Sequence, residues 1–179
     1  LNPTFAETIN AAKTTKISGA EVDMTLVPLP GLTVDLSYTY LDPDQPDQPN
    51  PLNNNIEERF ELAQSPRHAG ALGIAYEFEP FSFGVLGLHM DLTSTSQYAY
   101  APKNFEFQDS YTILNGRVTL SDIMLGSGDK NSLQLALWGK NLADEEYRVY
   151  AFPVGNPALT IPAAYGEPRS YGIELQYRY

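Results

Sequence analysis

The chain has 179 residues and a formal net charge of −11, with 11 Lys and Arg against 22 Asp and Glu. Because phosphate binding requires clustered cations, this charge balance argues against a nucleic-acid partner. The sequence has no cysteine, which excludes disulfide and thiolate chemistry, and no stretch of about 18 apolar residues that would form a transmembrane helix.

The first segment, Leu1 to Ile17, has neither the basic start nor the apolar centre of a signal peptide. Its composition is typical of the end of a loop. We therefore expect the chain to be one piece of a longer mature protein.

Seven strands are predicted along the chain, because apolar and polar residues alternate over segments of about ten residues. A content of 13 Gly, 14 Pro and 12 Tyr also favours strands and turns over helices. The predicted strands cover Lys16–Val27, Leu32–Leu41, Arg67–Phe78, Ser82–Leu92, Tyr111–Leu120, Leu133–Asn141 and Ser170–Tyr179.

The predicted connections alternate between short and long. Short or medium turns are expected at Pro28–Gly31, Glu79–Phe81 and Ser121–Ser132. Long loops are expected at Asp42–Pro66, Thr93–Ser110 and Leu142–Arg169. Short turns on one rim and long loops on the other are typical of bacterial outer-membrane barrels, in which the short side is periplasmic.

One face of every predicted strand carries no Lys, Arg, Asp or Glu, although composition alone would place about six charges there. A Lys or Arg at mid-membrane costs roughly 2–4 kcal/mol, so a charge-free face suits contact with lipid. The apolar positions are Ala20, Val22, Met24, Leu26, Leu32, Val34, Leu36, Tyr38, Tyr40, His68, Gly70, Leu72, Ile74, Tyr76, Phe78, Leu86, Leu88, Met90, Leu92, Thr112, Leu114, Gly116, Val118, Leu120, Leu133, Leu135, Leu137, Gly139 and the alternate residues of the last strand. The opposite face holds Glu21, Asp23, Asp35, Glu77, Asp91, Arg117, Lys140, Glu174 and Arg178.

Neither a catalytic site nor a metal site is predicted. The acidic segment Asp42–Asp47 lacks the Gly and Glu of an EF-hand loop, so we expect a solvated loop stiffened by proline. His89 and Asp91 share a face, but His68 is the only other histidine, which is too few for a metal cluster. No nucleophile elbow is present either.

Two further charged groups have plain structural interpretations. Three glutamates are expected to form a helical turn in a loop with their charges in solvent; they are Glu57, Glu58 and Glu61. Three cations could meet an anionic cargo, but we expect them to pair with carboxylates such as Glu21, Asp23, Glu167 and Glu174. These cations are Arg117, Lys140 and Arg169.

The last strand alternates strictly and ends on an aromatic residue, which is typical of the closing strand of an outer-membrane barrel. Its polar side carries Gly172, Glu174, Gln176 and Arg178. Its apolar side carries Tyr171, Ile173, Leu175, Tyr177 and Tyr179.

Three segments follow one another near the end of the chain: Ser110–Arg117 (SYTILNGR), Leu137–Tyr147 (LWGKNLADEEY) and Gly166–Gly172 (GEPRSYG). Together they resemble the C-terminal part of the β-barrel of TonB-dependent outer-membrane receptors. The motif residues are Lys140, Asn141, Leu142, Asp144, Glu145, Tyr147, Gly166, Glu167, Pro168, Arg169, Tyr171 and Gly172.

The resemblance implies an all-β fragment of an antiparallel transmembrane β-barrel, about seven of the roughly 22 strands of such a receptor, with short periplasmic turns and long extracellular loops. Residues 1–179 would then form the C-terminal portion of the barrel, without the plug domain. The implied cellular location is the bacterial outer membrane, where the barrel would contact lipid. The implied function is TonB-dependent uptake of a scarce substrate, most often a ferric siderophore or similar iron complex.

The resemblance also implies partners. Extracellular loops and the plug would bind the small-molecule ligand, and the TonB complex would act through an N-terminal region absent from this chain. The barrel-assembly machinery would recognise the last strand through Tyr179 and the alternating residues before it. The resemblance implies no enzymatic activity and no cofactor.

Two other hypotheses fit the alternation. A complete eight-stranded outer-membrane barrel with a structural or adhesion role would pair its first and last strands. A secreted β-sandwich binding module would need two sheets with facing apolar sides and no lipid band.

Overall fold

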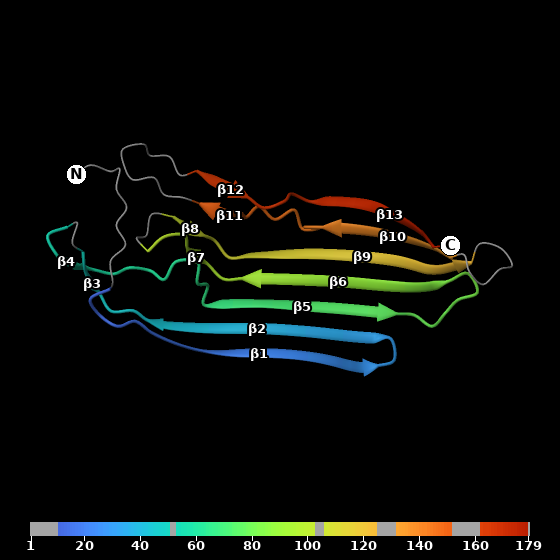
Figure 1. The fold of residues 1–179 in the computed structure, drawn as a ribbon, viewed down its shortest axis with the longest axis horizontal. Coiled ribbons are helices and arrows are strands. Elements are labelled where there is room, and N and C mark those ends of the chain that lie inside the picture. Colours follow the sequence, from blue (N-terminus) through green and yellow to red (C-terminus); the bar gives the residue numbers. More distant parts are fainter. Residues whose placement is uncertain (1–10, 51–52, 103–105, 125–131, 152–161, 179) are drawn as a thin grey trace.

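The computed structural model describes residues 11–50, 53–102, 106–124, 132–151 and 162–178, and their regular structure is β throughout (Figure 1). No helix among these residues is long and apolar enough to span a membrane.

The main feature is one antiparallel sheet of seven strands, in the order β1-β2-β5-β6-β9-β10-β13. Each strand pairs with the next long strand along the chain, so the sheet is a simple meander. Its strands are β1 (Lys16–Leu29), β2 (Leu32–Asp44), β5 (His68–Glu77), β6 (Val85–Thr95), β9 (Tyr111–Met124), β10 (Ser132–Lys140) and β13 (Ser170–Arg178). All seven predicted strands are confirmed.

The strand ends differ from the prediction in two informative places. β1 continues to Leu29, and the turn is made by Pro30 and Gly31, whose φ of +81° is the conformation that glycine favours after proline in a type II turn. β6 begins at Val85 rather than Ser82, because Phe81 and Gly84 bridge to each other and enclose a two-residue turn.

The pairing register aligns the predicted apolar positions of neighbouring strands on one face. One row runs Met24, Leu36, Leu72, Leu92, Leu114, each residue opposite the next. Since residues directly opposite each other project from the same side of a sheet, the apolar sets form one continuous surface, which we call the apolar face. The other side, the polar face, carries the row Asp35, Gly73, Asp91, Asn115.

A β-bulge keeps the apolar face intact where β9 was expected to end. The β9–β10 register shifts between Leu133 and Leu135, and Leu133 is opposite Ile123 instead of Asp122. Asp122 has a φ of +53°, so the extra residue is accommodated there. The bulge thereby keeps an acidic side chain out of the apolar row.

The apolar face is open in this chain. Ile173 is 73% exposed and Leu175 66% exposed, and only Ala99, Tyr100, Ala136 and Ala151 are buried apolar residues in the described part of the chain. A β-sandwich would bury such a face against a second sheet. The described residues therefore do not form the sandwich considered as an alternative.

The two rims of the sheet differ as predicted. Three short hairpins lie at one rim, on the side where β1 begins, while tight turns lie at the other (Figure 1). The hairpins are β3 (Gln48–Asn50) with β4 (Ile56–Glu58), β7 (Tyr98–Ala99) with β8 (Phe107–Gln108), and β11 (Arg148–Ala151) with β12 (Ala163–Tyr165). We call these the loop rim and the turn rim. Of the predicted Ser121–Ser132 turn, residues 125–131 lie outside the described part of the chain.

The sheet does not close on itself within the described residues. β1 and β13 stand at its two ends, and each has one strand partner, β2 and β10 respectively. An eight-stranded barrel of this chain alone would require the end strands to meet. The open order is what a fragment of a larger barrel has, as predicted.

Two loop predictions are corrected. Glu57 and Glu58 belong to strand β4 rather than to a helical turn, because β4 pairs with β3. Their carboxylates also have partners: Lys13 Nζ forms an ion pair with Glu57 at 2.6 Å from Oε2, and Asn53 Nδ2 donates to Glu58 Oε1 at 2.7 Å. In the Asp42–Asp47 segment, residues 42–44 extend β2 opposite β1 instead of forming a solvated loop.

Candidate functional site at the loop rim and on the polar face

Asn141 joins three segments at the end of β10. It is 3% exposed and has a φ of +48°, a left-handed conformation that asparagine tolerates better than most residues. Its side chain donates from Nδ2 to the carbonyls of Glu145 at 2.8 Å and Glu167 at 3.1 Å, and its Oδ1 accepts from Glu145 N at 2.8 Å. Its own N–H donates to Asn115 Oδ1 at 2.9 Å. One amide therefore fixes the beginning and the end of the third long connection.

A second contact closes the same connection. Arg169 donates from its backbone N to Asp144 Oδ1 at 3.2 Å and from Nη2 to Asp144 Oδ2 at 3.3 Å. Gly166 N donates to Tyr147 O at 2.8 Å, and a Cβ on Gly166 would overlap the Tyr147 ring. The ring in turn stacks on Tyr111 of β9, with centroids 4.8 Å apart. The structure thus brings the two halves of the sequence motif together as an anchor for the loop.

The polar face next to this anchor carries a hydrogen-bonded cluster. Asn115 Nδ2 donates to Asp91 Oδ1 at 2.7 Å, and His89 Nε2 lies 3.7 Å from Asp91 Oδ2. The cluster borders a hollow of about 420 Å³ that Trp138 and Arg117 also line. His89 and Asp91 are neighbours, as their shared face predicted, but the described residues contain no group of three or more His, Asp or Glu side chains placed to hold a metal ion.

The three predicted cations are all paired. Arg117 Nη2 lies 3.0 Å from Glu174 Oε2, which links β9 to β13. Lys140 Nζ lies 4.0 Å from Glu167 Oε2, and Arg169 pairs with Asp144 rather than with any of the four expected carboxylates. Because each cation already has a carboxylate beside it, the pairing interpretation is confirmed for these side chains.

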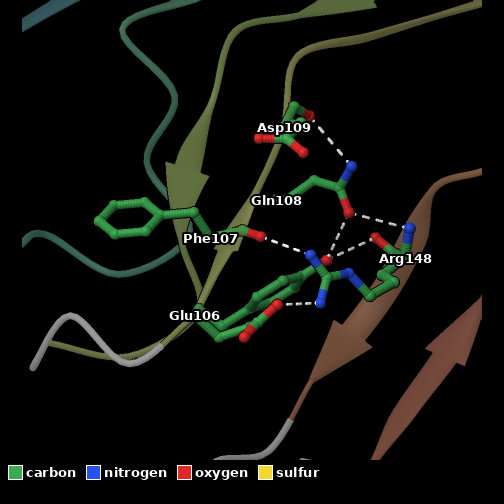
Figure 2. A network of polar contacts seen from close by, with 6 residues as sticks. Glu106, Phe107, Gln108, Asp109 and Arg148 are labelled. Atoms are coloured by element: carbon green, nitrogen blue, oxygen red, sulfur yellow. Dashed lines mark hydrogen bonds and ion pairs between the residues drawn. The ribbon is translucent and has the colours of Figure 1, made fainter.

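Arg148 on β11 is the centre of a polar network that sequence patterns missed (Figure 2). Its guanidinium forms an ion pair with Glu106 and donates from Nη2 to Phe107 O at 2.6 Å, while its backbone N donates to Gln108 Oε1 at 2.9 Å. Tyr100 Oη lies 2.8 Å from both Gln108 Oε1 and Arg148 O, and its single proton is directed to one of these two acceptors at a time. The network therefore joins the second and third long connections.

The network is shielded from solvent. The Arg148 and Glu106 side chains are 21% and 27% exposed, and Tyr100 and Gln108 are 6% and 4% exposed. The hydrogen bond to Glu106 raises the pKa of the Arg148 guanidinium, and burial raises the pKa of the Tyr100 hydroxyl. Arg148 thus stays charged and Tyr100 stays a neutral donor. Nothing in the sequence around these residues is periodic, so no pattern could have revealed contacts about 40 residues apart.

The first long connection contacts the second through backbone groups. Gln64 N donates to Ala99 O at 2.8 Å, and Glu61 N donates to Pro102 O at 2.6 Å. The three connections therefore form one continuous layer at the loop rim. Within it, a polar hollow of about 380 Å³ lies between the second and third connections, lined by Gln108, Asp109, Ser110, Glu145, Glu146, Arg148 and Tyr165. Its lining is polar and acidic, with three carboxylates and Arg148, which is already paired with Glu106.

Residues 1–142 match the sequence model of a family described as TonB dependent receptor-like, beta-barrel. FyuA, the ferric yersiniabactin uptake receptor from Yersinia pestis, superposes with a TM-score of 0.70 at 15% identity, over 92% of this chain and 24% of FyuA. BauA, the ferric preacinetobactin receptor from Acinetobacter baumannii, superposes with a TM-score of 0.62 at 19% identity, over 92% of this chain and 22% of BauA. No curated protein matches the sequence. The chain spans about a quarter of either receptor.

Proposed function

Because the chain belongs to the family of TonB-dependent receptor-like β-barrels, we propose that it forms the C-terminal part of the wall of a longer outer-membrane receptor that takes up a scarce substrate. Proteins of this family are transporters rather than enzymes. The observation that carries the proposal is the seven-stranded open sheet with one continuous apolar face and all its long connections at one rim. The loop rim is then extracellular and the turn rim periplasmic.

The limits of the apolar face support a membrane location. At the loop rim, Tyr38 Oη and His68 Nδ1 lie 2.7 Å apart, and Tyr40 packs beside His68 with ring centroids 5.2 Å apart. Beyond them on the same face, Lys16 is opposite Asp44. At the turn rim, Tyr76 packs against Phe78. Aromatic residues at both limits, with charges only outside them, are expected where a barrel meets the membrane interfaces.

We propose a ferric siderophore or a similar iron complex as the substrate, since both similar structures are named as receptors for ferric siderophore-type ligands. The polar hollow between the second and third connections is the part of this chain that we assign to substrate contact. The polar face would meet a plug domain supplied by the rest of the receptor. The TonB complex would act through that part as well.

Uptake by living cells tests the proposal. A strain that lacks the full-length gene should lose accumulation of one iron-labelled siderophore from a panel, and the restored gene should recover it. Removal of TonB from the restored strain should abolish the accumulation again, because transport by this family depends on it.

The panel should also contain haem, cobalamin and oligosaccharides. Recovery of one of those alone would keep the transporter assignment and reject the iron complex. Unchanged accumulation of every compound in the strain without the gene would reject the function.

A further inference from the structure

The apolar face has a concave region where two glycines lie opposite each other. Gly116 of β9 is paired with Gly139 of β10, and both occupy apolar-face positions of their strands. Neither carries a side chain, while their neighbours on the same face are large. The result is a hollow of about 550 Å³ that has an almost wholly apolar lining, which includes Leu88, Met90, Val118, Leu137, Leu142 and Tyr171. We call it the glycine groove.

Leu142 forms the edge of the groove nearest the loop rim. It follows Asn141, and its N–H donates to Leu114 O at 2.8 Å, so it takes the position beside Leu114 past the end of β10. A Cβ on Gly139 would come within 2.5 Å of Leu142 Cδ2, and a Cβ on Gly116 within 3.4 Å of Cδ1. The leucine side chain therefore overhangs both glycines on the apolar face. Tyr171, opposite Gly139 on β13, forms one side wall.

The register gives the depth of the groove. Tyr38, Gly70, Ser94 and Thr112 form one row across four strands, and the hydroxyls of Ser94 and Thr112 lie 2.9 Å apart. Hydroxyls and a tyrosine on the apolar face are suited to the headgroup boundary. The row of Met90 and Gly116 lies four residues further along each strand, which is roughly 13 Å along the strand axis and less in depth, because barrel strands are tilted. The groove thus extends from the loop rim, where Leu142 follows the end of β10, into the acyl region of the leaflet on the loop side.

From this geometry we propose that the glycine groove is a lipid-binding site that holds one acyl chain of an outer-leaflet lipid. The strand positions of His89, Asn115 and Arg117 also border the groove, but its surface is almost wholly apolar, and a hydrocarbon chain is the ligand that matches such a surface. The proposed function places the apolar face against lipid. The hydrocarbon chains of that lipid are therefore the ligands available to the groove. A concave site contacts a chain on several sides, whereas the neighbouring convex surface contacts it on one.

Photolabelling of the full-length receptor tests this site. The receptor is reconstituted in liposomes with a small fraction of phosphatidylethanolamine that carries a photoactivatable diazirine at mid-chain, and labelled residues are located by mass spectrometry. We expect label to concentrate on Met90, Val118 and Leu142 relative to Val22, an apolar-face residue of β1 that is 50% exposed. Even labelling of the apolar face would overturn the proposal.

Filling the groove provides the matched comparison. Gly116→Leu should lower labelling of Met90 and Leu142 to the level of Val22, whereas Ala20→Leu, which enlarges an apolar-face residue of β1, should leave it unchanged. Gly116→Ala is the milder filling, because its Cβ makes only an ordinary contact with Leu142. Persistent labelling of the groove in both Gly116 variants would contradict the site.

This inference rests on the membrane location in the proposed function. Uptake assays distinguish a failure of the lipid site from a failure of the transport function. Gly116→Leu should transport the substrate as wild type does, because the groove faces away from the polar face. Groove labelling without transport by the wild type would reject only the transport function. Transport with even labelling would reject only the lipid site.

Discussion

Arg148 holds two long connections together, and its replacement should loosen both. Arg148→Met removes the ion pair with Glu106 and the bond to Phe107 O. Hydrogen bonds to charged groups contribute about 1.5–3 kcal/mol, so amide exchange in the β7–β8 hairpin should accelerate by about 10- to 100-fold. Hydrogen-exchange mass spectrometry of the full-length receptor measures this change.

Arg67→Met is the matched control for that experiment. Arg67 also forms an ion pair at the loop rim, with its Nη1 3.3 Å from Asp42 Oδ1, but both side chains are more than half exposed. Exposed pairs contribute only about 0.2–1 kcal/mol, so exchange should change by less than about fivefold. Equal acceleration in both variants would show that burial of the Arg148 network has no special role.

At the scale of an element, the pairing of β10 with β13 depends on a glycine. Gly172 lies opposite Trp138, and a Cβ there would come within 2.5 Å of the indole Cζ2. Gly172→Ala must displace the ring, which we expect to lower the free energy of unfolding by roughly 1–3 kcal/mol, the usual cost of overpacking. Urea unfolding of the receptor in lipid vesicles measures the shift.

Gly73→Ala separates this steric effect from the general effect of replacing a strand glycine. Gly73 also lies on the polar face, and its Cβ would make only ordinary contacts of 3.6 Å and more with Asp35. We therefore expect it to unfold at the same urea concentration as wild type or slightly higher, since alanine loses less conformational freedom on folding. A loss equal to that of Gly172→Ala would contradict the role of the indole.

The strands were predictable because each has an apolar side and a polar side, which imposes a period of two on the sequence. That period ends where both faces meet water or a neighbouring loop. The extension of β9 to Met124 and the bulge at Asp122 were therefore missed. Asn141 lies within a motif that the family resemblance identified. Its hydrogen bonds could be found only from the fold, because they also join residues that are distant in the sequence. The Arg148 network joins segments far apart in sequence, and no local pattern encodes such contacts.

At the scale of the whole molecule, the two end strands have backbone edges that no other described strand pairs with. Among the described residues, β1 and β13 each have one partner in the sheet, and the apolar side chains of β13 are exposed, from Tyr171 at 79% to Tyr177 at 51%. An unpaired edge with an apolar face invites pairing with another strand. In a longer receptor, β13 would pair with the first strand of the barrel. This makes the last strand a candidate for recognition during assembly, before the barrel closes.

Deleting Tyr179 from the full-length receptor tests that assembly role. Tyr179 lies outside the described residues, but it follows the alternating apolar-face residues Tyr171, Ile173, Leu175 and Tyr177 of β13. We expect the deletion to lower the amount of receptor in the outer membrane, because a terminal aromatic would no longer be offered to the assembly machinery. Substrate affinity per inserted molecule should stay nearly unchanged, since β13 ends at the turn rim and the polar hollow lies at the loop rim. Heat-modifiable gel migration of membrane fractions quantifies insertion, and titration with the labelled substrate gives the affinity. Normal insertion together with weakened binding would place the C-terminus in ligand recognition and reject the assembly role.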